Sequence, residues 1–283
     1  LIGDFAFAIW DGTRQRLFAA RDALGVKSLY YHHQPDRLFA LASEENALRA
    51  LPAVPLRINE GRIADFLVAE LEGIDKTSTF SANILRLPPA CWITVDRSGL
   101  RTRTYWAPDV ARETLLPSDD QYVEAFLEHF TRAVRCRLRS ATPPAAMLSG
   151  GMDSSAVVAV ARRLQHQTGR RRLHTFSAVT PDQTTCPETH FIQRVLDSGP
   201  QTPHRVAVDR LGPFLDDLQQ AVAPPDNPFD IFMTLPRALY SAARGEGCKT
   251  LLDGVAGDNL CSYGTGYLAH LLRQGRWLTV LAD

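Results

Sequence analysis

The chain has 283 residues, and its 31 Lys and Arg balance 31 Asp and Glu, so the formal net charge is +0. Hydrophobic residues make up 45% of the chain, which excludes a disordered protein. The charge balance gives no basic surface for nucleic acid, and no apolar run approaches the ~18 residues of a membrane-spanning helix. The 5 cysteines include no CxxC pair, so we expect a reducing compartment, the cytoplasm.

Residues 1–106 are predicted to form the first of about two domains, since a domain averages roughly 150 residues. Short strand candidates follow one another between Gly, Asp and Pro residues, at 5–10, 17–20, 29–33, 38–42, 91–95 and 101–105. Apolar residues at helical spacing predict helices at 44–51 and 60–70. Strands at this density favour an α+β fold built on an antiparallel sandwich.

A polar stretch with prolines at 107–118 is predicted to be a linker. Ser118 and Gln121 form a capping-box pattern, which predicts a helix that begins there and ends near Leu138. Strands and helices then alternate, with strands at 145–148, 173–179, 204–208 and 250–252 and helices at 154–165, 187–196, 211–221 and 235–244. This alternation predicts a second domain at 119–283, with a parallel sheet covered by helices on both faces.

The loop at 149–155 (Ser-Gly-Gly-Met-Asp-Ser-Ser) lies between a predicted strand and a predicted helix. Open α/β sheets bind ligands at such strand ends, and glycines let a ligand approach the backbone. Serine hydroxyls and a helix N-terminus attract phosphate, and Asp153 fits among them if Mg²⁺ bridges its carboxylate to phosphate oxygens. The alternative is a Ser/Gly turn in which Asp or Ser only caps the helix.

This loop resembles the PP-loop of N-type ATP pyrophosphatases, in the form typical of asparagine synthetases. The resemblance implies an adenine nucleotide alpha hydrolase-like domain that adenylates a carboxylate with ATP, releases pyrophosphate and forms an amide with an amine or ammonia. Aspartate or another carboxylate is the implied acyl substrate. The implied ATP-binding residues are Leu148, Ser149, Gly150, Gly151, Asp153, Ser154, Ser155, Ala178 and Gly254.

A second glycine-bearing loop at 251–260 resembles the family's other nucleotide loop, and the resemblance implies that Asp153 and Asp258 share a Mg²⁺ ion. The family's catalytic base is a Glu at the position of Val255, which cannot transfer a proton, so the catalytic residue is unknown. Asn259 also replaces a common Glu. These departures favour, as an alternative, a lactam- or lasso-peptide-forming cyclase of the same fold. A catalytically degenerate nucleotide-binding homologue is a further alternative.

Residues 3–11, 21–31 and 42–44 resemble the later half of a class-II glutamine amidotransferase domain, an Ntn-type glutaminase fold. The resemblance implies ammonia from glutamine and assigns Arg21 and Asp22 a structural role. We expect a fragment, because the family's N-terminal Cys nucleophile and catalytic Lys have no counterparts here. Glu188 is interpreted as a solvated residue at a helix start. We expect small-molecule partners and no nucleic acid or membrane partner. A homodimer is compatible with the sequence.

Overall fold

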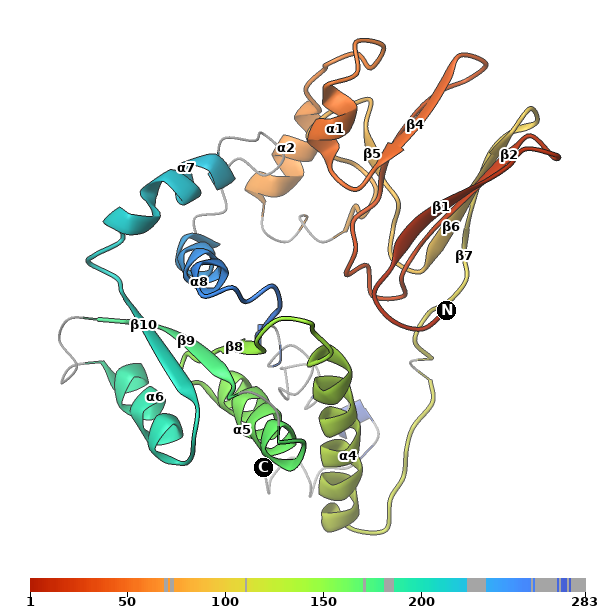
Figure 1. Cartoon of the computed structure of the whole chain (residues 1–283). Helices are drawn as coiled ribbons and strands as arrows, with labels where there is room; N and C mark the ends of the chain where they lie inside the picture. Colours follow the sequence, from red (N-terminus) through yellow and green to blue (C-terminus); the bar gives the residue numbers. More distant parts are fainter. Residues whose placement is uncertain are drawn as a thin grey trace. The chain divides into compact units, whose positions relative to one another are not determined.

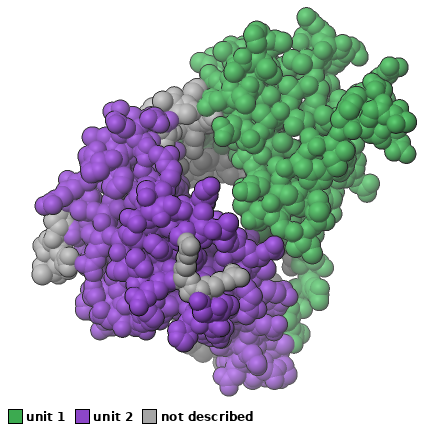
Figure 2. Space-filling model, viewed as in Figure 1, with its two compact units in different colours: residues 1–115, 222–229 green, residues 116–221, 230–283 purple. Residues whose placement is uncertain are grey.

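The protein is described by a computed structural model that covers residues 1–68, 71, 74–109, 111–169, 172–180, 186–222, 233–255, 257, 269, 271–273 and 275. It divides into two compact units (Figure 2), one of residues 1–115 with 222–229 and one of residues 116–221 with 230–283. The two units divide after residue 115, within the stretch 107–118 that we predict to be a linker.

Unit 1 contains two antiparallel sheets (Figure 1). The first has the order β1-β2-β6-β7, from β1 (Ala6–Asp11), β2 (Arg16–Arg21), β6 (Cys91–Asp96) and β7 (Gly99–Thr104). The second has the order β4-β3-β5, from β3 (Tyr30–Gln34), β4 (Leu38–Ala42) and β5 (Leu85–Arg86). One core cluster joins Ala19 and Ile93 of the first sheet to Tyr31 of the second. The prediction of an antiparallel sandwich is therefore confirmed.

The helices of unit 1 are short and pack near the smaller sheet. They are α1 (Glu45–Arg49) and α2 (Glu60–Leu67). Leu48 of α1 is buried with Val54 and Ile84, and Tyr30 and Leu38 pack against this cluster. Asn59 caps α2, since its side chain accepts a hydrogen bond from the Arg62 amide.

Unit 2 is built on a parallel sheet with the strand order β10-β9-β8-β11, as predicted. The strands are β8 (Ala145–Met147), β9 (His174–Val179), β10 (Thr202–Ala207) and β11 (Leu251–Leu252). All three strand pairings are parallel. The carboxyl ends of these strands therefore meet at one edge of the sheet, which is where the two glycine-bearing loops begin.

Helices cover both faces of this sheet, as predicted (Figure 1). One face is covered by α4 (Asp119–Arg137), α5 (Met152–Gln167) and α6 (Pro187–Asp197). The other is covered by η1 (Gly212–Phe214) and α8 (Thr234–Gly245), and α7 (Leu215–Val222) follows η1. Successive side chains of β8 point to opposite faces of the sheet, so Ala146 packs in the core cluster on the first face and Ala145 in the cluster on the second.

Some local predictions differ from the structure, two of them at helix starts. Ser118 is the N-cap residue of α4, but its side chain makes no capping hydrogen bond, so the capping box is wrong. Helix α5 begins at Met152 rather than at Ser154. Its N-cap residue is Gly151, which has no side chain that could indicate a cap in the sequence. Because the helix begins at Met152, Asp153 and Ser154 lie in its first turn. Among the residues that the structure describes, no helix is long and apolar enough to span a membrane.

Candidate functional site

A cavity of about 340 Å³ lies in unit 2, where the loops after β8 and β11 meet α6 and α8. Seven of the predicted site residues line it: Leu148, Ser149, Gly151, Asp153, Ser154, Ala178 and Gly254. Of the other predicted residues, Gly150 and Ser155 do not line it, and Asp258 lies outside the described residues together with Asn259.

The backbone of the first loop has a conformation that favours glycine at Gly150, where φ is +84°. A Cβ atom at this position would lie 2.6 Å from the carbonyl oxygen of Glu188 and 3.1 Å from the amide nitrogen of Ile192. The first turns of α6 therefore pack directly on the loop. This packing explains why Gly150 contributes to the shape of the site without lining the cavity.

A hydroxyl network holds the first loop in place. The buried Ser154 Oγ accepts a hydrogen bond from the Ser149 amide at 3.2 Å and donates one to the Gly151 carbonyl oxygen at 3.2 Å. It also lies 3.0 Å from Ser149 Oγ. The first amides of a helix have no partner within the helix, so the start of α5 offers donors to an anion.

The second loop lies directly against the first. A Cβ atom at Gly254 would lie 2.6 Å from the Ser154 nitrogen, so only a glycine lets the second loop approach this amide so closely. A Cβ atom at Gly257 would lie 2.6 Å from both Cγ and Oδ2 of Asp153. The second loop therefore passes beside the Asp153 carboxylate, although the two loops are far apart in the sequence.

Among the residues that the structure describes, three acidic side chains line the cavity: Asp153, Glu188 and Asp253. Sequence reasoning interpreted Glu188 as solvated; it is exposed, but it also faces the cavity, because α6 packs on the loop. Sequence reasoning did not single out Asp253, although its place directly before Gly254 was a usable signal. Burial raises the pKa of Tyr240, and the charge of Asp253 raises it further.

The apolar wall of the cavity comes from α8, through Leu235, Pro236 and Leu239. Val255 lies at the rim, is 71% exposed, and donates its amide hydrogen to Asp253 Oδ1 at 3.3 Å. The cavity thus combines an apolar wall, helix-start amides and carboxylates. Amides suit phosphate oxygens, and carboxylate oxygens are the ligands that Mg²⁺ prefers, so the donor set fits a polyphosphate with its cation.

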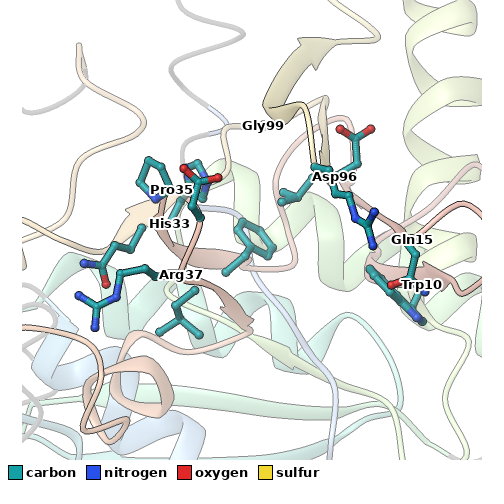
Figure 3. A pocket seen from close by; sticks show the side chains of 13 residues that line it. Trp10, Gln15, His33, Pro35, Arg37, Asp96 and Gly99 are labelled. Carbon is teal, nitrogen blue, oxygen red and sulfur yellow. The ribbon is translucent and has the colours of Figure 1, made fainter.

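A second cavity of about 460 Å³ lies at the hairpin tips of unit 1 (Figure 3). Trp10, His33, Arg37 and Asp96 are among its lining residues. Of the predicted site residues that the structure describes, none lines this cavity. The predicted chemistry is therefore concentrated at the cavity of unit 2.

The fold and the unit 2 cavity define the class of protein: an antiparallel sandwich joined in one chain to an open parallel α/β domain with its cavity at the strand ends. The family model described as "Glutamine amidotransferase domain" matches residues 1–106, and the one described as "Asparagine synthase" matches residues 125–282. The chain belongs to the asparagine synthase family.

Similar proteins come from bacteria, archaea and fungi. The chain is 31% identical over 241 residues to asparagine synthetase [glutamine-hydrolyzing] 3 of Bacillus subtilis, a match covering 81% of this chain and 38% of that protein. It is 28% identical over 269 residues to the putative asparagine synthetase [glutamine-hydrolyzing] 2 of Methanocaldococcus jannaschii, covering 95% and 50%. It is 32% identical over 200 residues to amidase chry2 of Gibberella zeae, covering 68% and 28%. The chain thus spans half or less of these relatives.

Proposed function

We propose that this chain carries the nucleotide-activating part of an ATP-dependent, amide-forming ligase of the asparagine synthase type. The single observation that carries the proposal is the contact of Gly254 and Gly257 with Asp153, which brings two glycine-bearing loops to one cavity. Membership of the asparagine synthase family supports the same reaction class.

In this proposal, ATP lies along the first loop and under Gly254. The helix-start amides and Ser149 bind phosphate oxygens, while Leu148 and Ala178 contact the adenine side of the nucleotide. Gly150, Gly151, Ser154 and Ser155 keep the loop in the required shape.

Asp153 and Asp258 are proposed to hold Mg²⁺, which would neutralise phosphate charge and the leaving pyrophosphate. Asp153 lines the cavity, and its carboxylate oxygens are ligands of the kind that Mg²⁺ prefers. Asp258 is the next residue along the chain from Gly257.

The proposed reaction has two steps. A substrate carboxylate oxygen attacks the α-phosphorus of ATP, the bond to the β-phosphate oxygen breaks, and pyrophosphate leaves. An amine or ammonia then attacks the acyl carbon, loses a proton and displaces AMP. The cavity contributes by positioning the reactants and by stabilising negative charge, which are large terms in enzymatic catalysis.

Unit 1 is proposed to belong to the part that releases ammonia from glutamine, supported by the glutamine amidotransferase match. The proposed organisation is an amidotransferase part at 1–106, a linker at 107–118 and a synthetase part at 119–283. Small-molecule substrates, a cytoplasmic location and a homodimer belong to this proposal as well.

Calorimetric titration of the purified chain with Mg·ATP tests the proposal, with ATP–pyrophosphate exchange in the presence of aspartate as the activity readout. We expect Asp153→Ala to weaken Mg·ATP binding by at least ~10-fold, about 1.4 kcal/mol. The matched control is Asp120→Ala, which removes an exposed carboxylate from α4. Equal binding by wild type and Asp153→Ala would refute the role of Asp153. Absence of binding by the wild type would favour a degenerate homologue.

A second candidate function is a cyclase that forms a lactam or peptide amide from an internal amine. Val255 favours it, because the asparagine synthetases that this loop resembles carry a Glu at this position, whereas related amide-forming enzymes vary there. The similarity to a protein named amidase chry2 shows that names other than asparagine synthetase occur among the relatives. ATP–pyrophosphate exchange distinguishes the two candidates when it is measured once with aspartate and once with amino-acid substrates that carry an internal amine.

A further inference from the structure

Two histidines lie side by side in unit 2, away from the cavity. His174 is the first residue of β9, whereas Ala178, which lines the cavity, follows four residues later, about 13 Å along the strand. His204 lies on the neighbouring strand β10. The pair therefore occupies the amino-terminal edge of the parallel sheet, the edge opposite the proposed ATP site.

The strand register places both imidazoles on one face. His174 pairs with Thr202, and His204 pairs with Phe176, so the two histidines are diagonal neighbours. Helix α8 covers this face, and Glu246 is its C-cap residue. The topology thus brings a carboxylate to the histidine pair.

The ligand atoms are close enough to share one ion. His174 Nδ1 lies 2.9 Å from His204 Nε2, and the other ring nitrogen of His204, Nδ1, lies 3.7 Å from Glu246 Oε1. A shared ion takes only one of the two His204 nitrogens. One ligand atom from each of the three residues lies within 4.8 Å of the others. In a tetrahedral zinc site with bonds of 2.0–2.1 Å, ligand atoms lie about 3.4 Å apart, so the three side chains have to adjust their positions to surround an ion.

The surroundings favour the site in two ways. The His204 ring stacks on Phe176, with centroids 4.5 Å apart and planes 8° apart, and Phe176 is completely buried, so this imidazole has a fixed orientation. The Glu246 side chain is 50% exposed and is free of such packing, so it can adjust to an ion.

We propose that His174, His204 and Glu246 bind a divalent transition-metal ion of the Zn²⁺ type, with water completing the coordination. Imidazole nitrogens are borderline ligands that suit Zn²⁺ better than Mg²⁺, and two histidines with one carboxylate are a ligand set that binds Zn²⁺ in proteins. The ion joins β9, β10 and the end of α8, so its role is to stabilise unit 2. It is separate from the Mg²⁺ that we propose beside Asp153.

The experiment uses the untagged chain after removal of metal with a chelator. Zn²⁺ is titrated by calorimetry and by thermal shift, and Co²⁺ serves as a spectroscopic probe because its visible absorption reports tetrahedral coordination. We expect one Zn²⁺ per chain and a higher Tm. His174→Gln and Glu246→Gln are each expected to weaken Zn²⁺ binding by at least ~10-fold.

The matched control is His166→Gln, which removes an exposed histidine near the end of α5. It is expected to leave Zn²⁺ binding and the Co²⁺ spectrum unchanged. Glu246→Gln changes an exposed side chain, so it tests the site even if His174→Gln folds poorly. The proposal would be overturned if the wild type did not bind Zn²⁺ or if Glu246→Gln bound Zn²⁺ as tightly as the wild type. It would also be overturned if His166→Gln weakened Zn²⁺ binding as much as the variants of the site.

Discussion

Gly254 lies so close to Asp153 that a Cβ atom at position 254 would come within 2.9 Å of the Asp153 Cβ and 2.8 Å of its carbonyl carbon. The nearest atoms are backbone and Cβ atoms, which cannot swing aside as the end of a flexible side chain can. The second loop can therefore reach the start of α5 only with a glycine at this position.

Replacing Gly254 with Ala is expected to separate the two loops. Because the added methyl group would press on the Ser154 amide at 2.6 Å, we expect Mg·ATP binding to weaken by at least ~10-fold, about 1.4 kcal/mol. Calorimetric titration measures the effect. Gly245→Ala in α8 is the control, since nothing lies within 4 Å of its Cβ position. Unchanged binding by Gly254→Ala would contradict the proposed place of the nucleotide.

Replacing Gly150 with Ala is expected to destabilise unit 2 by about 2–4 kcal/mol, from backbone strain and from the clash with α6. The strain arises from φ of +84°, and the clash is with the Glu188 carbonyl oxygen. Gly169→Ala separates the two causes, because Gly169 has φ of +61° but nothing within 4 Å of its Cβ position. Chemical denaturation measures both variants, and equal losses would show that packing on α6 contributes nothing.

Replacing Asp22 with Ala is expected to destabilise unit 1 by about 2–4 kcal/mol, because backbone amides would lose their acceptor in a buried place. The Asp22 carboxylate accepts hydrogen bonds from the amides of Leu24, Val26 and Lys27, and the residue is 1% exposed. Burial alone would raise the pKa of Asp22, but these amides outweigh it and lower the pKa. Asp11→Ala, in an exposed turn with two such amides, is the control with the smaller expected loss.

The acid stability of unit 1 is expected to depend on Asp96. Hydrogen bonds from the Ser98 hydroxyl and amide, and then from Arg16, lower the pKa of Asp96 from 3.8 to about 2. A lowered pKa stabilises the folded state above the unfolded pKa, and this contribution is lost as the pH falls from 3.8 towards 2. The difference in unfolding free energy between wild type and Asp96→Asn should therefore shrink with acidification below about pH 4. A difference that stays constant would show that Asp96 does not titrate in this way.

Much of the fold could be predicted from local patterns. The strand at 91–95 and the alternation of strands and helices after residue 145 are visible because apolar residues repeat with the period of the element. The strand β5 (Leu85–Arg86) was not predicted, because two residues are too few to show an alternation. The predicted helix at 211–221 is divided in the structure into η1 and α7, with Pro213 in the 3-10 turn.

The candidate site was only partly visible in the sequence. The glycines and serines of the two loops could be identified because they are contiguous and have a recognisable pattern. The contribution of Glu188 depends on α6 packing against Gly150, and the apolar wall depends on where α8 crosses the sheet. Both are long-range contacts, which no local pattern reports.

The pairing of β11 with β8 has a consequence for how the protein is made. Leu251 and Leu252 pair with Ala145 and Ala146, and this short register is what brings the second loop to the first. The ribosome synthesises β8 long before β11. The nascent chain therefore contains the loop at 149–155 before the second loop, which contacts it, has been made. The cavity of unit 2 is therefore completed late, by a strand only two residues long.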